Sequence, residues 1–372
     1  MSFPYLQLEG DPYTQGLAQG QQLQPQIGHN LEVYFRRFEV EGKLHREAVL
    51  ERSERYLSAI SSKNPDYFAG IEGIADGGGF DLLEIGALNF RYEILYHQFD
   101  HEEASSRFAS EEASSRFAHE PPQGCTAFAV LPSASADGAL WMGQNWDWIV
   151  DVKGALLHTR HPDGLETLSF TEAGIFGGKI GMNSAGLGLC INGLVSADDD
   201  WSRLGKPFHL RTYEVLCSRT LEEAIAKATE EPRSGSANFL IGQGEKAVNL
   251  ETAPHALIQL EGERLVHANH FVDPGRYGVR LSPVEWLDRS HHRHHRLEAL
   301  IAQKKPGLED FKAALADGEG HPYAVCRYPS PEEFELGEPY QTVASVIMNL
   351  STREMWVSDG PPDQNPYQRY RF

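Results

Sequence analysis

The sequence predicts an α+β fold, because a helical first part is followed by a large strand-rich part. Helical patterns cover most of the stretch from residue 13 to residue 93, whereas short apolar runs separated by turns dominate from residue 125 onward. The second part contains only a few helical patterns, and strands do not alternate regularly with helices there. This segregation favours packed layers of sheet and helix over repeated βαβ units.

The first part opens with a strand-like run and continues as helices. The expected elements are a short strand at 3–9 and helical stretches at 13–38, at 46–61 and from 72 onward, with a break at 77–79. Pro25 is expected to kink or divide the first helical stretch. Gly16 and Gly20 lie on one face of that stretch, and this spacing predicts close approach by another backbone.

The second part consists mostly of short strand-like runs. They lie at 125–132, 139–148, 155–160, 166–173, 179–194, 237–242, 247–253, 256–262 and 264–270, with helices expected at about 220–230 and 308–316. The first of these helices has a capping box formed by Thr220 and Glu223. A hairpin is expected near the end, where runs at 342–350 and 354–360 flank a short turn.

A tandem repeat separates the two parts, with EEASSRFAS followed by EEASSRFAH at residues 102–119. Small, polar and charged residues dominate there, which predicts an exposed, mobile linker without a chemical role. The expected organisation is a helical leader with its linker, residues 1–124, and a larger domain, residues 125–372.

Charge and cysteine content exclude several classes of protein. The 372 residues include 33 Lys and Arg against 53 Asp and Glu, a formal net charge of −20, so no nucleic-acid partner is expected. Four cysteines without a CxxC pair indicate neither a zinc ribbon nor a disulfide scaffold. The sequence shows no secretory signal and no apolar run of bilayer length, so we expect a cytoplasmic protein without a membrane partner.

The most informative point is Gly124-Cys125, where the linker meets the first strand of the larger domain. Glycine leaves its carbonyl open to attack and tolerates strained backbone geometry. The Cys125 thiol could add to the Gly124 carbonyl, accept the acyl group from nitrogen and lose it to water. The new α-amine of Cys125, with a pKa near ~8, could then act as the base for its own thiol. A buried strand cysteine without chemistry is the alternative.

A second strand with polar residues is expected beside this cysteine. Residues 143–148, GQNWDW, are predicted to form a hairpin with 125–131. That pairing would bring Asn145 and Asp147 back toward Cys125. A carboxylate at this place could hold the α-amine or position an arginine.

Motifs along most of the chain resemble the acyl-coenzyme A:6-aminopenicillanic acid acyltransferase family, whose members are self-processing N-terminal-nucleophile (Ntn) hydrolases. GCTAFAV followed by GQNWDW is the most specific part of the resemblance. Further motifs in the shared order lie at 10–20, 72–93, 172–194, 267–271, 321–327 and 348–362. The repetitive stretch at 94–123 is the poor match.

The resemblance implies an αββα sandwich, with two antiparallel sheets between helical layers. It also implies that Cys125 is the nucleophile and its amine the base, and that Asp147 orients this amine. Asn269 would donate its side-chain amide to the oxyanion, which is typically worth about 10²–10³ in rate. Arg327 would help to hold the site together. Supporting positions beside the nucleophile are Thr126, Asn145 and Trp146.

Several further features are interpreted without a chemical role. His291, His292, His294 and His295 surround Arg293 in SHHRHHR. This spacing could bind a metal, but the glutamate of HExxH is missing, so a solvated helix start and no metal are predicted. Asp198–Asp200 are interpreted as a polar loop at a sheet edge, because they lack the alternate spacing of a calcium loop. Cys190 and Cys217 are interpreted as core residues.

The favoured function is that of a self-processing N-terminal-cysteine amidohydrolase, which cleaves small N-acyl amides through a thioester acyl-enzyme. It requires no cofactor, its partner is a small-molecule substrate, and the two fragments of the chain are expected to stay associated. A second possibility is an acyltransferase that moves an acyl group from acyl-coenzyme A or an amide to an amine. The chain could instead be an uncleaved, non-enzymatic binding protein of the same fold, or a metal-dependent hydrolase built on the histidines.

Overall fold

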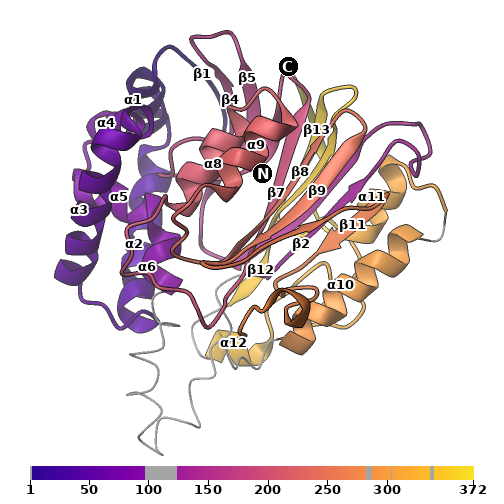
Figure 1. Ribbon diagram of the computed structural model, residues 1–372. Coiled ribbons are helices and arrows are strands. Elements are labelled where there is room, and N and C mark those ends of the chain that lie inside the picture. Colours follow the sequence, from indigo (N-terminus) through magenta and orange to yellow (C-terminus); the bar gives the residue numbers. More distant parts are fainter. Residues whose placement is uncertain (1, 97–123, 282–286, 303, 336–338) are drawn as a thin grey trace, which may run out of the picture.

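Two β-sheets packed face to face form the centre of the molecule (Figure 1). The computed structural model describes residues 2–96, 124–281, 287–302, 304–335 and 339–372. The linker and its repeat at 102–119 lie outside the described residues. The predicted mobility of that segment therefore stays a prediction.

The first sheet has eight strands and the second has six. The eight-stranded order is β1 (Tyr5–Glu9), β4 (Gly154–Arg160), β5 (Glu166–Glu172), β6 (Ile180–Asn183), β7 (Leu187–Gly193), β8 (Ala237–Gln243), β9 (Lys246–Thr252) and β10 (Leu257–Leu260). The six-stranded order is β11 (Arg264–His267), β2 (Gly124–Val130), β3 (Trp141–Ile149), β12 (Tyr340–Asn349), β13 (Glu354–Asp359) and β14 (Gln368–Arg371). Within the described residues, β1 and β4 form a parallel pair and the remaining ladders are antiparallel.

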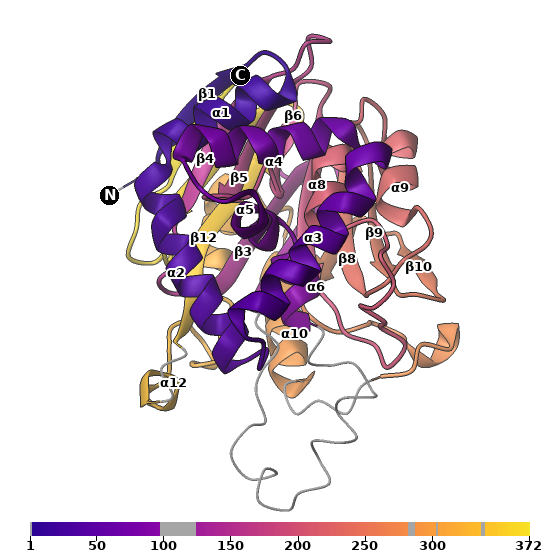
Figure 2. The ribbon, with the colours of Figure 1, turned by 90° about the vertical axis from the view of Figure 1, so that its left-hand side faces the viewer.

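Helices cover both outer faces of the sandwich. The leader helices are α1 (Pro12–Gln22), α2 (Gln24–Val40), α3 (Arg46–Lys63), α4 (Pro65–Gly78), α5 (Leu82–Asn89) and α6 (Arg91–Tyr96). They lie on the same side as α8 (Phe208–Leu216) and α9 (Leu221–Thr229), which contact the eight-stranded sheet (Figures 1 and 2). On the opposite side, α10 (Leu287–Ala302) and α11 (Leu308–Leu315) pack on the six-stranded sheet, and the short α12 (Pro331–Glu335) follows. The predicted αββα sandwich is therefore confirmed.

Most predicted elements are found, but one helix starts earlier than predicted and another was not predicted. Pro25 divides the first helical stretch as expected, because α1 ends at Gln22 and Pro25 lies at the start of α2. The helix predicted from Glu72 starts earlier, at Pro65, since proline fits the first turn of a helix. Helix α8 was not among the predicted elements. No helix among the described residues combines the length and apolar character that crossing a bilayer requires.

The glycines of α1 allow its backbone to lie close to that of α4. A Cβ atom at Gly16 would lie 2.1 Å from the carbonyl oxygen of Gly70 in α4, and one at Gly73 would lie 2.2 Å from that of Tyr13. Real Cβ atoms do not approach backbone so closely, so only glycine allows the two helices to meet at this separation. The predicted backbone approach at Gly16 and Gly20 is confirmed.

We predict that Gly16→Ala lowers the free energy of unfolding by about 1–3 kcal/mol, because the added methyl group forces α1 away from α4. Gly28→Ala in α2 is the matched control, since its Cβ would meet nothing closer than 3.8 Å. That change should raise stability by up to ~1 kcal/mol, through helix propensity alone. Urea unfolding of both variants checks this, and equal midpoints would contradict the tight packing.

Candidate active site

The predicted hairpin of β2 and β3 sets the positions of the candidate residues. Gly124 pairs with Asp147, Cys125 with Trp146, and Thr126 with Asn145. Residues directly opposite one another in an antiparallel ladder share a face, with Cβ atoms about 4.5–5.5 Å apart. The sequence-predicted pairing is therefore confirmed, and it brings Asp147 beside the bond that joins Gly124 to Cys125.

Cys125 is fully buried at the start of β2. Its backbone N–H donates a hydrogen bond to Oδ1 of Asn269 over 2.9 Å. Burial, with a smaller contribution from Asp147, raises the pKa of the Cys125 thiol to about 12. In the intact chain the thiol is therefore protonated at neutral pH.

Asn269 follows β11 and is held by four hydrogen bonds. Its backbone N–H donates to Ser290 over 2.7 Å, and its side-chain Nδ2 donates to the carbonyl of Gly193 over 3.1 Å. Its Oδ1 accepts from both Cys125 and Arg293. The structure thus places Asn269 against Cys125, with its amide nitrogen directed at Gly193. The role of oxyanion donor stays a prediction.

Asp147 is buried and has one close hydrogen-bond donor. Its Oδ1 accepts from the hydroxyl of Thr342 over 2.6 Å, whereas Oδ2 has no hydrogen-bond partner within the described part of the chain. Burial raises the pKa of Asp147 to about 6, although Arg293, Thr342 and Arg327 act in the opposite direction. The carboxylate is thus ionised at neutral pH but binds a proton readily in mild acid.

Arg327 reaches the same place from the segment before α12. Its backbone N–H donates to the Thr342 hydroxyl over 2.9 Å, so this hydroxyl links Arg327 to Asp147. Its guanidinium forms an ion pair with Glu333. A Cβ atom at Gly124 would lie 2.8 Å from Nη1 of Arg327 and 3.2 Å from Oδ2 of Asp147. The absence of a side chain at Gly124 therefore makes room for both charged groups.

Arg293 is a member of the site that the sequence interpretation missed. It lies within SHHRHHR on α10, yet it is buried, and its Nη2 donates to Oδ1 of Asn269 over 2.8 Å. Burial lowers its pKa to about 10, with Asp147 acting in the opposite direction. The buried residues of α10 are Ser290, Arg293, Leu297 and Ile301. This helical spacing of buried positions is a signal from which a buried face of α10 could have been predicted, despite the many histidines.

The prediction of a solvated helix start is wrong for this face of α10. Ser290 hydrogen-bonds His270 over 2.8 Å, and the ring centroids of His270 and His291 are 3.8 Å apart. Burial and neighbouring histidines lower the pKa of His270 to about 2 and that of His294 to about 4. Within the described residues, no group of three or more His, Cys, Asp or Glu side chains is arranged to hold a metal ion.

The three supporting positions differ in their contacts. Asn145 donates from Nδ2 to the carbonyls of Leu315 and Val325, each over 2.8 Å, and thereby ties β3 to α11. Trp146 lies beneath the ammonium of Lys179. The Thr126 hydroxyl is buried, without a hydrogen-bond partner in the part of the chain that is described.

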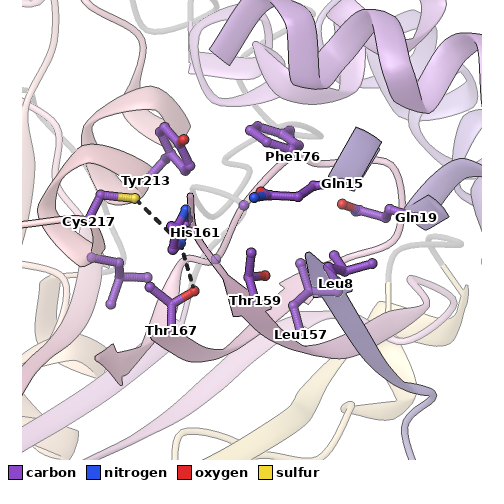
Figure 3. A pocket seen from close by; sticks show the side chains of 13 residues that line it. Leu8, Gln15, Gln19, Leu157, Thr159, His161, Thr167, Phe176, Tyr213 and Cys217 are labelled. Carbon is purple, nitrogen blue, oxygen red and sulfur yellow. Dashed lines mark hydrogen bonds between the residues drawn. The ribbon is translucent and has the colours of Figure 1, made fainter. Parts of the chain in front are cut away.

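A pocket elsewhere contains none of the predicted site residues (Figure 3). Its wall includes His161, whose Nε2 lies 3.3 Å from the Thr167 hydroxyl and 3.9 Å from the Cys217 sulfur (Figure 3). Its free volume of about 10 Å³ accommodates roughly one water molecule. Burial raises the pKa of the Cys217 thiol to about 12.

The structure confirms some and contradicts other predictions for three residues that were interpreted without a chemical role. Cys190 is buried in the core, as predicted, whereas Cys217 is only partly buried. Asp199 does not behave as part of a polar loop, because it is buried and accepts hydrogen bonds from Ser196 and Ser236. Burial raises the pKa of Asp199 to about 7.

The αββα sandwich is the fold of the Ntn hydrolases. The chain belongs to the acyl-coenzyme A:6-aminopenicillanic acid acyl-transferase family, whose model matches residues 134–364. That range includes Asp147, Asn269 and Arg327 and begins after Cys125. The acyl-coenzyme A:6-aminopenicillanic-acid-acyltransferase 40 kDa form of Emericella nidulans is 30% identical over 289 residues, which cover 76% of this chain and 72% of that protein.

Solved structures show a weaker likeness. An N-acylethanolamine-hydrolyzing acid amidase orthologue of Caenorhabditis elegans has a TM-score of 0.45 at 13% identity, covering 67% of this chain and 100% of its own. A variant of conjugated bile acid hydrolase from Clostridium perfringens has a TM-score of 0.41 at 14% identity, covering 67% of this chain and 97% of its own.

We predict that Thr342→Val lowers the free energy of unfolding by about 1.5–3 kcal/mol at pH 8, because ionised Asp147 and, independently of pH, the backbone N–H of Arg327 each lose a hydrogen bond. That bond lowers the pKa of Asp147, so its removal raises this pKa further above 6. The loss of stability caused by Thr342→Val should therefore be largest above the raised pKa of Asp147. It should become smaller as the pH falls toward 5, where Asp147 is protonated both with and without the substitution.

Thr126→Val is the matched control, because it removes a buried hydroxyl without a partner in the described residues. This control should change stability by less than about 1 kcal/mol. Both variants are introduced into Cys125→Ala, so that urea unfolding is measured on the intact chain. A deficit of Thr342→Val that is the same at pH 5 and pH 8 would contradict the assignment of the bond to ionised Asp147.

Proposed function

We propose that the protein is a self-processing amidohydrolase, which cuts itself before Cys125 and then cleaves small N-acyl amides through a thioester on that residue. The observation that carries this proposal is the position of Cys125. It is the second residue of β2, directly after Gly124. Its amide N–H donates to Asn269, and Asp147 lies opposite the bond to be cut. Membership of an acyl-transfer family supports the same chemistry.

Self-cleavage begins with attack of the Cys125 sulfur on the Gly124 carbonyl carbon. The thiol proton passes to the leaving nitrogen as the carbon–nitrogen bond breaks, which produces a thioester and a free α-amine. Water then hydrolyses the thioester, releasing the Gly124 carboxylate and restoring the thiol. Asp147 and Arg327 both lie beside Gly124, where they can orient the reacting groups.

Turnover reuses the same groups after cleavage. The α-amine of Cys125 takes the thiol proton, and the thiolate attacks the substrate carbonyl. The amine part of the substrate leaves with that proton, and water releases the acyl group as a carboxylate. Asn269 lies at hydrogen-bond distance from the Cys125 nitrogen, so the α-amine would form beside it and Asp147.

The leader supplies buried contacts that favour continued association of the two fragments. Asn30 of α2 donates from Nδ2 to the carbonyls of Lys153 and Ala173, each over 2.9 Å. Tyr34 and Arg91 both bind Glu172, a buried residue of the larger fragment. Breaking such contacts would expose apolar surface and unpaired charge, which is costly in water.

We predict that purified protein runs on denaturing gels as two bands, and that their masses correspond to residues 1–124 and 125–372. Cys125→Ala should give one band of the full chain without activity, because both steps lose their nucleophile. Cys217→Ser is the matched control and should be cleaved normally. Active protein with an intact bond before Cys125 would refute the proposal, and one persistent band without activity would favour a non-enzymatic binding protein.

Acyl transfer to an amine is the second candidate, because the 30% identical relative is named as an acyltransferase. The thioester on Cys125 would then pass to an amine, with acyl-coenzyme A or an amide as donor.

We predict that N-acyl amides release free acid as the main product, even with a primary amine at millimolar concentration. The mature enzyme is incubated with N-acyl amides and with acyl-coenzyme A, and products are quantified by mass spectrometry. Cys125→Ala serves as the blank for uncatalysed aminolysis. A new amide as the main product would assign transferase activity instead, and activity lost on chelation would favour a metal-dependent hydrolase.

A further inference from the structure

A buried cluster of charged residues lies between the two sheets, and the proposed mechanism does not use it. Lys179 comes directly before β6, and its ammonium forms an ion pair with Glu172 at the end of β5. Glu172 also forms an ion pair with Arg91 and accepts a hydrogen bond from the hydroxyl of Tyr34. The side chains of Lys179, Glu172 and Arg91 are each about 1% exposed, so water screens their charges very little.

The ammonium of Lys179 extends from one sheet to the other. Its Nζ lies 3.2 Å from the ring centroid of Trp146 in β3, a cation–π contact across the inter-sheet space. Trp146 is the cross-strand partner of Cys125, and directly opposed residues direct their side chains to the same face of a sheet. The ammonium therefore occupies the face of the sheet toward which the Cys125 sulfur points.

Among the described residues, the cluster contains two basic side chains and one carboxylate. Glu172 is the carboxylate shared by Arg91 and Lys179, while the Tyr34 hydroxyl contributes a neutral donor. Among the other titratable groups, Cys125 of β2 interacts with Lys179, and His209 of α8 interacts with Arg91, Glu172 and Lys179. Cys190 of β7 interacts with Cys125, whereas Asp147 of β3 and Arg293 of α10 act on Cys125 from the opposite face of the hairpin. Burial lowers the pKa of His209 well below its ordinary value, so it adds no charge.

We propose that Lys179 is a positioning residue for the nucleophile: its ammonium, fixed by Glu172 against Trp146, stabilises the thiolate of Cys125 in the mature enzyme. This inference rests on the proposed function, since it requires Cys125 to react as a thiolate. The proton from sulfur goes to the α-amine, and Lys179 exchanges none. Tyr34 and Arg91 belong to the leader, so the smaller fragment fixes the partner of Lys179.

The electrostatic consequences are consistent with this geometry. Burial lowers the pKa of Lys179 to about 7, while Glu172 and the Cys125 thiolate act in the opposite direction. The pKa of Glu172 falls to about 2 despite its burial, because Arg91 and Lys179 stabilise the carboxylate. Glu172 therefore stays ionised, and formation of a thiolate helps Lys179 to keep its proton.

Three variants separate charge from packing. Lys179→Met keeps the approximate volume and removes the charge, and Glu172 keeps Arg91 and Tyr34 as partners. Lys179→Arg keeps the charge. Lys206→Met is the matched control, because Lys206 is another largely buried lysine, paired with Glu214 and Glu230 rather than with the cluster.

The test measures the rate at which iodoacetamide alkylates Cys125 in the processed protein between pH 5 and pH 9, by peptide mass spectrometry, with activity followed in parallel. Lys179→Met should raise the apparent thiol pKa by about one unit, which lowers the alkylation rate near neutral pH about tenfold. Lys179→Arg and Lys206→Met should remain within about twofold of the unmodified protein.

Identical alkylation profiles for Lys179→Met and the unmodified protein would overturn the inference. If Lys179→Met does not accumulate as folded protein, Lys179→Arg provides the test. A Cys125 thiol pKa at or below that of the unmodified protein supports the proposed role of Lys179, and a rise of about one unit overturns it. Alkylation of Cys125 that leaves activity intact would instead refute the proposed function. The two failures are therefore distinguishable.

Discussion

The register between β2 and β3 is the constraint on which the candidate site depends. It places Gly124 opposite Asp147 and Cys125 opposite Trp146, and the faces of the hairpin follow from this. Side chains alternate along a strand, so a slip of one residue would direct Asp147 into the inter-sheet space. The same slip would direct the indole of Trp146 away from Lys179, which it contacts in the observed register. Strand pairing therefore fixes the chemistry on both faces of the hairpin at once.

Buried charge surrounds Cys125 from two directions. On one face of the hairpin, Asp147 lies with Arg293 and Arg327, and on the opposite face Lys179 lies with Glu172. Ions without partners would be too costly in such a position, and each has at least one ion-pair, hydroxyl or amide partner, although Oδ2 of Asp147 has none among the described residues. The intact chain keeps the thiol protonated by burying it. Under the proposed function, activation would depend on a change at the backbone nitrogen and not on a rearrangement of the fold.

Much of the architecture was predictable because its signals are local. Alternating apolar runs and turn residues gave the strands from Cys125 to His267 and the hairpin of β12 and β13, and glycine spacing gave the contact at Gly16. Arg293 was missed because four histidines made its helix appear solvated, although the spacing to Leu297 and Ile301 marks a buried face. Lys179 carries no local signal, since its importance arises from a tryptophan on the opposite sheet.

The edge strand β1 belongs to the leader and pairs in parallel with β4, which lies beyond the proposed cut. A cleaved molecule would therefore have a continuous sheet made from two polypeptides, folded while they were still one. Once denatured, its parts would have to find each other by diffusion, and recovery would depend on concentration. The protein would then resist loss of structure through a slow unfolding rate, and heat inactivation would be effectively irreversible.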